Sequence, residues 1–285
     1  MATVALILHN DRPSAAMLAR EIAAWLDERG HTVQTPTLDA ACAGLEAHAV
    51  DPLLVGVGAD VAVSLGGDGT MLRTIQLVAA HGVPVIGVNL GELVYLTELE
   101  PAKILDSLAQ FFAGAYLIEE RMMLHVGIES SGRVEATEAV ALNEAVLEKT
   151  LSGHTVRLDV EINGSFFTPY ATDGLIVATP TGSTAYAFSA RGPIIAPTHR
   201  SLLLTPVSPH MLFDRSLILD AETSLRVTVD GYRPAALTVD GRMLGELREG
   251  DSITCTAAPF SARLVIFGPR DFHRILKSKF GLSDR

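Results

Sequence analysis

The segment from residue 60 to residue 88 limits the fold more than any other part of the sequence. Asp60–Leu65 is an apolar run typical of a buried strand, Gly66–Thr70 reads Gly-Gly-Asp-Gly-Thr, and residues 71–81 have helical spacing. Val83–Val88 is a second apolar run. A strand, a helix and a strand at this spacing predict parallel strands with a right-handed crossover, covered by helices.

The rest of the first 119 residues continues this α/β pattern. Val4–Leu8 is predicted as a buried strand, residues 11–29 as a helix with Pro13 in its first turn, and Thr32–Thr35 as a strand. A further helix is predicted over 101–112. Residues 38–58 show no clear period. The N-terminal region is therefore expected to be an α/β domain with a parallel sheet.

After about residue 119 the pattern changes to short strands separated by turns. Asn163-Gly164, Asp230-Gly231 and Asp240-Gly241 are typical hairpin turns. The predicted strands cover residues 124–128, 138–147, 155–162, 175–178, 202–206, 225–229 and 264–267. We therefore expect an α/β domain over 1–119, a mainly β domain over 120–268, and a tail over 269–285 that packs on the first domain.

Charge and composition exclude several classes of protein. Lys and Arg total 22 against 33 for Asp and Glu, a net charge of -11, which argues against a nucleic acid as partner. No stretch approaches the roughly 20 apolar residues that span a bilayer, and the N-terminus does not resemble a signal peptide. The two cysteines suit a reducing compartment. We expect a cytoplasmic protein with no membrane partner.

The glycine-rich segment predicts a phosphate site. Glycines at the carboxyl end of a parallel strand let a ligand approach the backbone, and the next helix offers free N–H groups. Asp68 places a carboxylate there, either as proton acceptor for an attacking hydroxyl or as holder of a metal carried by the phosphates. The alternative is a tight turn with a capping Asp. Arg73 either reaches a phosphate or is a solvated surface residue.

Two further segments carry polar groups in apolar surroundings. Asn143 and Glu144 interrupt the apolar run 139–147, so they either form a structural pair or face a ligand, such as a base edge and sugar hydroxyls. Five hydroxyl-bearing residues lie between Thr179 and Tyr186, and we interpret them as a cradle for ribose and phosphate oxygens. A purely structural turn is the alternative. Ser183 or Thr184 is expected to cap a short helix there.

Together, the Gly-Gly-Asp-Gly-Thr segment, the Asn143-Glu144 pair and the Thr179–Tyr186 turn before Gly192-Pro193 resemble the NAD kinase family. The resemblance implies a Rossmann-like, phosphofructokinase-like first domain. It also implies phosphorylation of the adenosine-ribose 2′-hydroxyl of NAD by ATP or polyphosphate, giving NADP. Relatives of this kind use Mg²⁺ with the donor and form homodimers or homotetramers through the β domain.

The same resemblance assigns roles to individual residues. Asp68 corresponds to the proton acceptor. The loop for the phosphate donor comprises Gly66, Gly67, Gly69 and Thr70. The positions implied for NAD are Asp68, Gly69, Arg73, Tyr95, Asn143, Glu144, His154, Asp173, Thr181, Thr184, Ala185, Tyr186, Ala187, Phe188, Ser189, Ser208 and Arg242.

The chain departs from its relatives at a few of these positions. Leu93-Val94-Tyr95 stands where many relatives have Leu-Gly-Phe, and His154 and Ala171 stand where relatives often carry Arg. Arg242 replaces what is more often an amide or imidazole. Two other functions therefore stay open: a lipid or sugar kinase that shares only the loop with Asp68, and a weakly active NAD(P)-binding protein.

Overall fold

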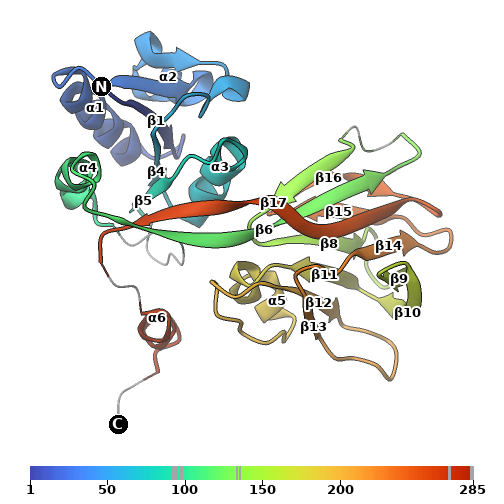
Figure 1. Ribbon diagram of the computed structural model, residues 1–285. Coiled ribbons are helices and arrows are strands. Elements are labelled where there is room, and N and C mark those ends of the chain that lie inside the picture. The colour runs from blue at the N-terminus through green and yellow to red at the C-terminus, as the bar shows by residue number, and fades with distance from the viewer. Residues whose placement is uncertain (92–95, 97–98, 133, 135, 269–270, 283–285) are drawn as a thin grey trace. The chain divides into compact units, whose positions relative to one another are not determined.

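The computed structural model describes residues 1–91, 96, 99–132, 134, 136–268 and 271–282 (Figure 1). The chain forms two compact units, one of Met1–Glu120 with Ala262–Arg285 and one of Arg121–Ser261. It leaves the first unit within strand β6 (Leu117–Glu129) and returns within β17 (Ser252–Ile266). The first unit is therefore built from both ends of the chain.

The first unit contains a parallel sheet, as predicted. Its strands are ordered β3-β2-β1-β4-β5, and the end of β17 pairs in parallel with β5. Their bounds are Thr3–Leu8 for β1, Thr32–Pro36 for β2, Ala49–Val50 for β3, Val61–Gly66 for β4 and Val85–Asn89 for β5. The strand order reverses between β1 and β4, which is where ligands bind in open α/β sheets.

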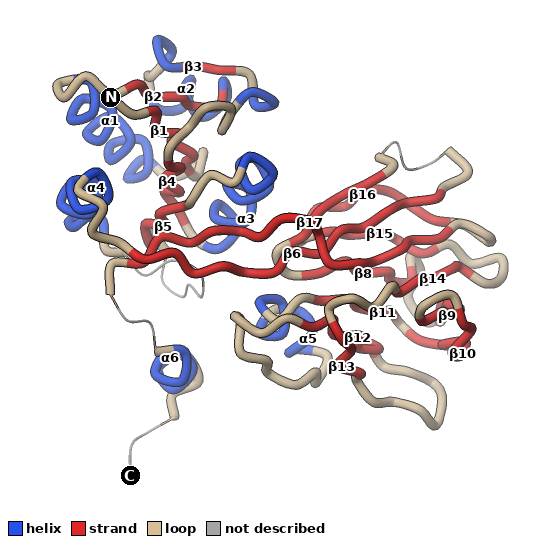
Figure 2. The backbone as a smooth tube through the Cα atoms, viewed as in Figure 1, coloured by secondary structure: helices blue, strands red, loops and turns tan. Residues whose placement is uncertain are grey.

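Helices flank this sheet, as the blue segments of Figure 2 show. They are α1 (Pro13–Asp27), α2 (Thr37–Ala43), α3 (Asp68–Val78) and α4 (Ile104–Phe112). A separate helix, α6 (Phe272–Lys279), follows near the C-terminus. Short 3-10 turns cover Glu46–His48, Pro52–Leu54, Ala79–His81 and Pro101–Lys103. Ile22 and Leu26 of α1 join the buried core with Leu6 and Val63 of the sheet. Of the helices described, none is long and apolar enough to cross a membrane.

Helix α3 begins earlier than predicted. Asp68, Gly69 and Thr70 were expected in a loop, but they form the first turn of the helix. Gly67 precedes the helix in an extended conformation, with φ -105° and ψ -163°. A carboxylate in the first turn is favoured by the helix dipole, which explains why Asp68 starts the helix. Helix α2 lies in the stretch that shows no clear period.

The second unit contains two antiparallel sheets, and this confirms the mainly β domain. One sheet contains β10 (Ser165–Thr172), β9 (Val156–Ile162), β14 (Leu225–Val229) and β17, with β6 paired to β17 and β7 (Glu138–Ala141) paired to β6. The other is ordered β13 (Leu217–Asp220), β12 (Ser201–Val207), β11 (Gly174–Ala178), β8 (Glu144–Lys149), β15 (Ala235–Val239) and β16 (Arg242–Leu247). Both sheets contribute to one core, in which Leu158 and Val227 join Leu175 and Leu237.

Several local predictions for this unit are wrong. The strand expected over 138–147 is split into β7 and β8, and β10, β13, β15 and β16 lie where no strand was expected. Asp230-Gly231 is not a hairpin turn, because β14 and β15 on either side of it belong to different sheets. Asn163-Gly164 and Asp240-Gly241 do connect paired strands, and all four of these residues have positive φ. The residue types in a turn determine the local bend of the backbone. Which strands then pair depends on how the side chains of the whole core pack.

Candidate active site

A pocket of about 440 Å³ lies at the carboxyl ends of β1 and β4. The residues that follow β1 form one wall, and the start of α3 forms the other. Its lining comprises Leu8, His9, Asn10, Asp11, Arg12, Gly67, Gly69, Thr70 and Arg73. The pocket therefore lies where the strand order of the sheet reverses.

The glycines of this segment have separate structural tasks. A Cβ atom added at Gly66 would lie 2.2 Å from Oγ1 of Thr70, so the threonine side chain needs glycine beneath it. Gly67 and Gly69 line the pocket without a side chain. The backbone N–H groups in the first turn of α3 lack intrahelical partners and are the usual donors to an anion.

Asp68 is half-buried at the start of α3. Its Oδ1 atom accepts a hydrogen bond from the backbone N–H of Leu96 at 2.9 Å. This contact orients the carboxylate from outside its own helix. Val94 and Tyr95, the expected aromatic side of the NAD site, lie outside the described residues.

The side chain of Arg73 is held in place by hydrogen bonds and does not extend freely into solvent. Its Nη1 and Nη2 atoms donate to Oδ1 and Oδ2 of Asp39 at 2.8 and 2.6 Å, and Nη2 also donates to the Leu8 carbonyl. Asp39 is completely buried, whereas the Arg73 side chain keeps 36% of its surface exposed. No pattern in the sequence selects Asp39, which belongs to the stretch without a clear period.

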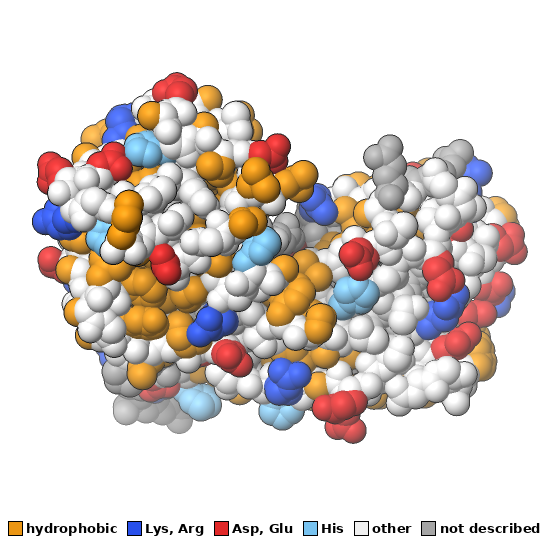
Figure 3. All heavy atoms as spheres, turned by 45° about the horizontal axis from the view of Figure 1, so that its top comes forward, with side chains coloured by type: hydrophobic (Ala, Val, Ile, Leu, Met, Phe, Trp, Pro, Cys, Tyr) orange, Lys and Arg blue, Asp and Glu red, His pale blue; other side chains and the backbone are white. Residues whose placement is uncertain are grey.

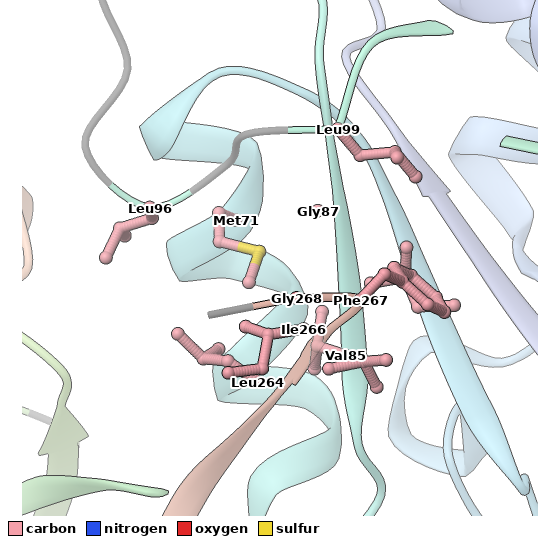
Figure 4. A pocket seen from close by; sticks show the side chains of 11 residues that line it. Met71, Val85, Gly87, Leu96, Leu99, Leu264, Ile266, Phe267 and Gly268 are labelled. Carbon is pink, nitrogen blue, oxygen red and sulfur yellow. The ribbon is translucent and has the colours of Figure 1, made fainter. Parts of the chain in front are cut away.

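A second cavity of the first unit, of about 230 Å³, is apolar (Figure 4). Met71 projects into it from α3, Val85 from β5, and Leu264 and Ile266 from β17. The described lining residues are all apolar or glycine. The side chains of this cavity suit an uncharged group and include no cation for a phosphate.

In the second unit, the break between β7 and β8 presents Asn143 and Glu144. At this break the chain passes from one sheet to the other, and the carboxylate of Asp240 accepts the backbone N–H groups of Leu142, Asn143 and Glu144 at 2.7, 2.8 and 3.1 Å. These donors are consequently turned away from strand pairing. Asp240 was recognised in the sequence only as a turn residue, although Asp side chains in turns commonly accept backbone N–H groups.

Among the carboxyl groups of this region, that of Glu144 has the pKa furthest from its ordinary value. Burial, and then the negative charge of Asp240, raise its pKa to about 8, although a hydrogen bond from the backbone of Tyr186 opposes this. Only 7% of the residue is exposed, and its Oε2 atom has no hydrogen-bond partner within the described part of the chain. Buried carboxyl oxygens are normally satisfied, so this one is suited to a ligand hydroxyl.

The hydroxyl groups of the Thr179–Tyr186 turn mostly bond to the protein itself. Ser183 Oγ donates to the Pro180 carbonyl at 2.7 Å and accepts the Ile195 N–H at 2.9 Å. Thr179 donates to the carbonyl of Leu142, Thr184 to that of Thr181, and Thr181 Oγ1 accepts from Arg121. The Tyr186 hydroxyl donates to Glu148. These contacts favour the structural alternative for the buried hydroxyls of Thr179 and Ser183, and ligand binding by the turn stays a prediction.

This turn nevertheless lies directly against the Asn143-Glu144 pair. A Cβ atom at Gly182 would come within 2.2 Å of the Asn143 carbonyl oxygen, so only glycine permits the approach. A 3-10 turn over Thr181–Thr184 then leads to α5 (Tyr186–Ser189). Ala185 precedes α5 and no side chain caps it, so the expected cap by Ser183 or Thr184 is wrong. Figure 1 shows α5 beside β11 and β12.

Some of the remaining residues predicted for the NAD site lie together, and others do not. A pocket of about 690 Å³ brings Tyr186, Ser189 and Ser208 together. Asp173 is half-buried and forms an ion pair with Lys149 Nζ at 2.7 Å. His154 and Arg242 are exposed, and no hydrogen bond or ion pair of the described residues joins their side chains to the turn. Ala187 of α5 is buried against β8, β11 and β12, whereas Phe188 is partly exposed.

No group of three His, Cys, Asp or Glu side chains in the described ranges is placed to hold a metal ion.

Comparison with known proteins decides the family. The model of the ATP-NAD kinase N-terminal domain matches residues 4–116, and that of the C-terminal domain matches residues 142–267. The chain belongs to the NAD kinase family. NAD kinase of Heliobacterium modesticaldum is 40% identical over 282 residues, which is 98% of each chain. NAD kinase of Moorella thermoacetica is 38% identical over 98% of this chain and 89% of its own.

Solved structures of NAD kinases share the fold. Yeast NADH kinase complexed with NADH is 26% identical and has a TM-score of 0.89, covering 100% of this chain and 89% of its own. The NAD kinase from Archaeoglobus fulgidus in complex with ATP has a TM-score of 0.70 at 23% identity, covering 98% and 97%. The expected α/β and mainly β domains are thus those of the family.

The raised pKa of Glu144 predicts a pH-dependent stability. Between about pH 4.5 and 8 the folded protein keeps a proton on Glu144 that the unfolded chain releases, so the free energy of unfolding falls as pH rises. The loss is up to about 1.4 kcal/mol per pH unit. Glu144→Gln removes this titration, so its stability relative to wild type should increase from pH 5 to 8 and then level off. Urea unfolding without NAD measures the difference, and a difference independent of pH would contradict the assignment.

Proposed function

We propose that this chain transfers a phosphoryl group from ATP or polyphosphate to the adenosine-ribose 2′-hydroxyl of NAD, giving NADP. The observation that carries the proposal is the position of Asp68 in a chain of this family. Its carboxylate starts α3, beside a pocket at the switch point of the sheet, and is oriented by the Leu96 N–H. A phosphate donor and a proton acceptor are thus expected side by side.

In the proposed reaction, Asp68 takes the proton of the 2′-hydroxyl as the oxygen attacks the terminal phosphorus of the donor. The new O–P bond forms while the bond to the leaving phosphate breaks, so ATP leaves as ADP. Phosphoryl transfer depends mainly on positioning and on neutralising charge. Gly66, Gly67, Gly69 and Thr70 supply backbone donors, and the charge of Asp68 disfavours a 2′-phosphate at the same place.

A divalent ion such as Mg²⁺ enters, in this proposal, as part of the donor. Phosphate oxygens and water suit Mg²⁺ and leave few positions for protein ligands. On the face shown in Figure 3, Lys and Arg side chains stand singly rather than as one basic patch. Backbone N–H groups and the ion therefore provide most of the neutralisation.

The second unit provides the proposed NAD site. Glu144, with its unsatisfied oxygen, binds ribose hydroxyls, and the neighbouring Asn143 binds the adenine edge. The further proposed contacts are Gly69, Tyr95, His154, Asp173, Thr181, Thr184, Ala185, Tyr186, Ala187, Phe188, Ser189, Ser208 and Arg242. Thr181 and Thr184 contribute through the backbone of the turn, because their hydroxyls are bonded within the protein. A reducing compartment such as the cytoplasm suits the free cysteines Cys42 and Cys255.

We propose a homodimer or homotetramer formed through the second unit. Two edge strands of this unit expose apolar side chains: Phe166 of β10 is 63% exposed and Ile218 of β13 is 54% exposed. Leu212, between β12 and β13, is fully exposed. Exposed apolar groups on edge strands are commonly covered by a partner.

Light scattering at tens of micromolar protein tests this assembly. We expect a mass of two or four times the chain mass of 30.3 kDa, and a lower mass for Phe166→Glu. A wild-type mass of one chain would contradict the assembly.

The proposed reaction is tested by NADP formation from NAD with Mg²⁺ and either ATP or polyphosphate. Asp68→Asn keeps the acceptor for the Leu96 N–H but removes the base, so kcat should fall by about a hundredfold or more. NAD affinity, measured by calorimetry, should stay within about twofold.

Asp106→Asn is the matched control, because Asp106 also lies in the first turn of a helix of the same unit, and should leave turnover unchanged. Wild-type turnover in Asp68→Asn would remove Asp68 from the mechanism. Phosphorylation of diacylglycerol with no reaction of NAD would overturn the function itself.

A further inference from the structure

Asp39 is a buried carboxylate beneath the pocket at the switch point. It lies on α2 with no exposed surface, and Oδ2 accepts the backbone N–H of Leu8 at 2.9 Å. Both of its oxygens also accept from the guanidinium of Arg73, at 2.8 and 2.6 Å. The carboxylate therefore joins the end of β1 to the second turn of α3.

The loop after β1 is tied to the same carboxylate. When the side-chain amide of Asn10 is oriented with its nitrogen toward these acceptors, the nitrogen donates to Asp39 Oδ1 at 3.1 Å and to the Leu8 carbonyl at 3.2 Å. Leu8, Asn10 and Arg73 all line the pocket. One buried side chain thus fixes wall residues from two segments that are far apart in sequence, the end of β1 with its following loop and α3.

The geometry leaves part of Arg73 available to a ligand. Its described contacts with Asp39 and Leu8 use three of the five guanidinium N–H donors. The side chain retains 36% exposure and lies along the pocket that also contains Gly67 and Gly69. Because Asp39 balances its charge, Arg73 offers oriented donors rather than a net positive charge. Guanidinium N–H donors that are already held in a plane before a ligand binds suit phosphate oxygens.

We propose that Asp39 is a positioning residue for the phosphate donor: it holds Arg73 and the loop after β1 in the arrangement that receives the donor's phosphate chain. The proposal rests on the proposed function, and it assigns Arg73 to the donor rather than to NAD. Holding these groups before binding avoids the entropy cost of ordering them with each turnover. Asp39 itself touches no reacting atom.

Asp39→Asn tests the proposal, because it keeps the size of the side chain but removes one charged acceptor oxygen. Loss of a charge-assisted contact corresponds to about a tenfold change in affinity. We expect KM for ATP and the dissociation constant of ATP with Mg²⁺, measured by calorimetry, to rise about tenfold. KM for NAD should stay within about twofold.

Arg73→Gln separates positioning from a general loss of structure. If Asp39 acts through Arg73, the single Arg73→Gln variant and the double Asp39→Asn/Arg73→Gln variant should show the same increase in KM for ATP. Arg73→Gln alone also keeps the test valid if Asp39→Asn does not fold, since its side chain is partly exposed. An unchanged donor KM in Arg73→Gln would overturn the proposal.

Two control variants complete the experiment. Asp60→Asn changes a carboxylate that accepts the Thr3 N–H at the opposite end of β1, and Ile22→Val loosens the core of the same unit. Neither should change donor KM. Equal changes in the KM values of ATP and NAD in Asp39→Asn would contradict positioning of the donor.

The outcome also distinguishes this proposal from the proposed function. If wild type forms no NADP, the proposed function fails, while calorimetry with ATP and Mg²⁺ still tests the role of Asp39. If wild type forms NADP but Asp39→Asn binds ATP normally, the role of Asp39 fails alone.

Discussion

The carboxylate of Asp240 accepts hydrogen bonds from three consecutive backbone N–H groups, and the NAD site proposed for the second unit depends on this contact. An uninterrupted strand would have directed alternate side chains into the core and to the opposite face. Asp240 instead ends β7, starts β8 and leaves Asn143 and Glu144 at the break. The same charge then acts on Glu144, whose pKa it helps to raise to about 8.

The first unit uses the same kind of contact. Asp39 accepts the N–H of Leu8, and Asp68 accepts the N–H of Leu96. The chain has fewer Lys and Arg, 22, than Asp and Glu, 33, and backbone N–H groups hold these carboxylates as well as the Arg73 guanidinium does. Their positions are set by strands and helix ends, so these side chains need little reorganisation when a substrate binds. Acidic side chains can therefore lie close to phosphates without being displaced.

The sequence was sufficient for those features that depend on local pattern. The buried run ending at Gly66 and the glycines after it predicted the parallel sheet and selected Asp68. Asn143 and Glu144 were found because polar residues inside an apolar run need partners. Asp39 could not be found in this way, since its partners are 31 and 34 residues away along the chain. The hydroxyl content of the turn did not reveal that Ser183 bonds to the backbone of Pro180 and Ile195, because composition does not tell a backbone partner from a ligand.

The NAD affinity of Asp240→Asn tests most directly whether backbone-held carboxylates organise the site. Loss of the charged acceptor should weaken NAD binding about tenfold in calorimetry. Asp251→Asn is the matched control, because Asp251 is another buried carboxylate of the second unit that accepts backbone N–H groups, from Ser131 and Arg248. Its NAD affinity should equal that of wild type. A folded Asp240→Asn variant that binds NAD as tightly as wild type would contradict the account.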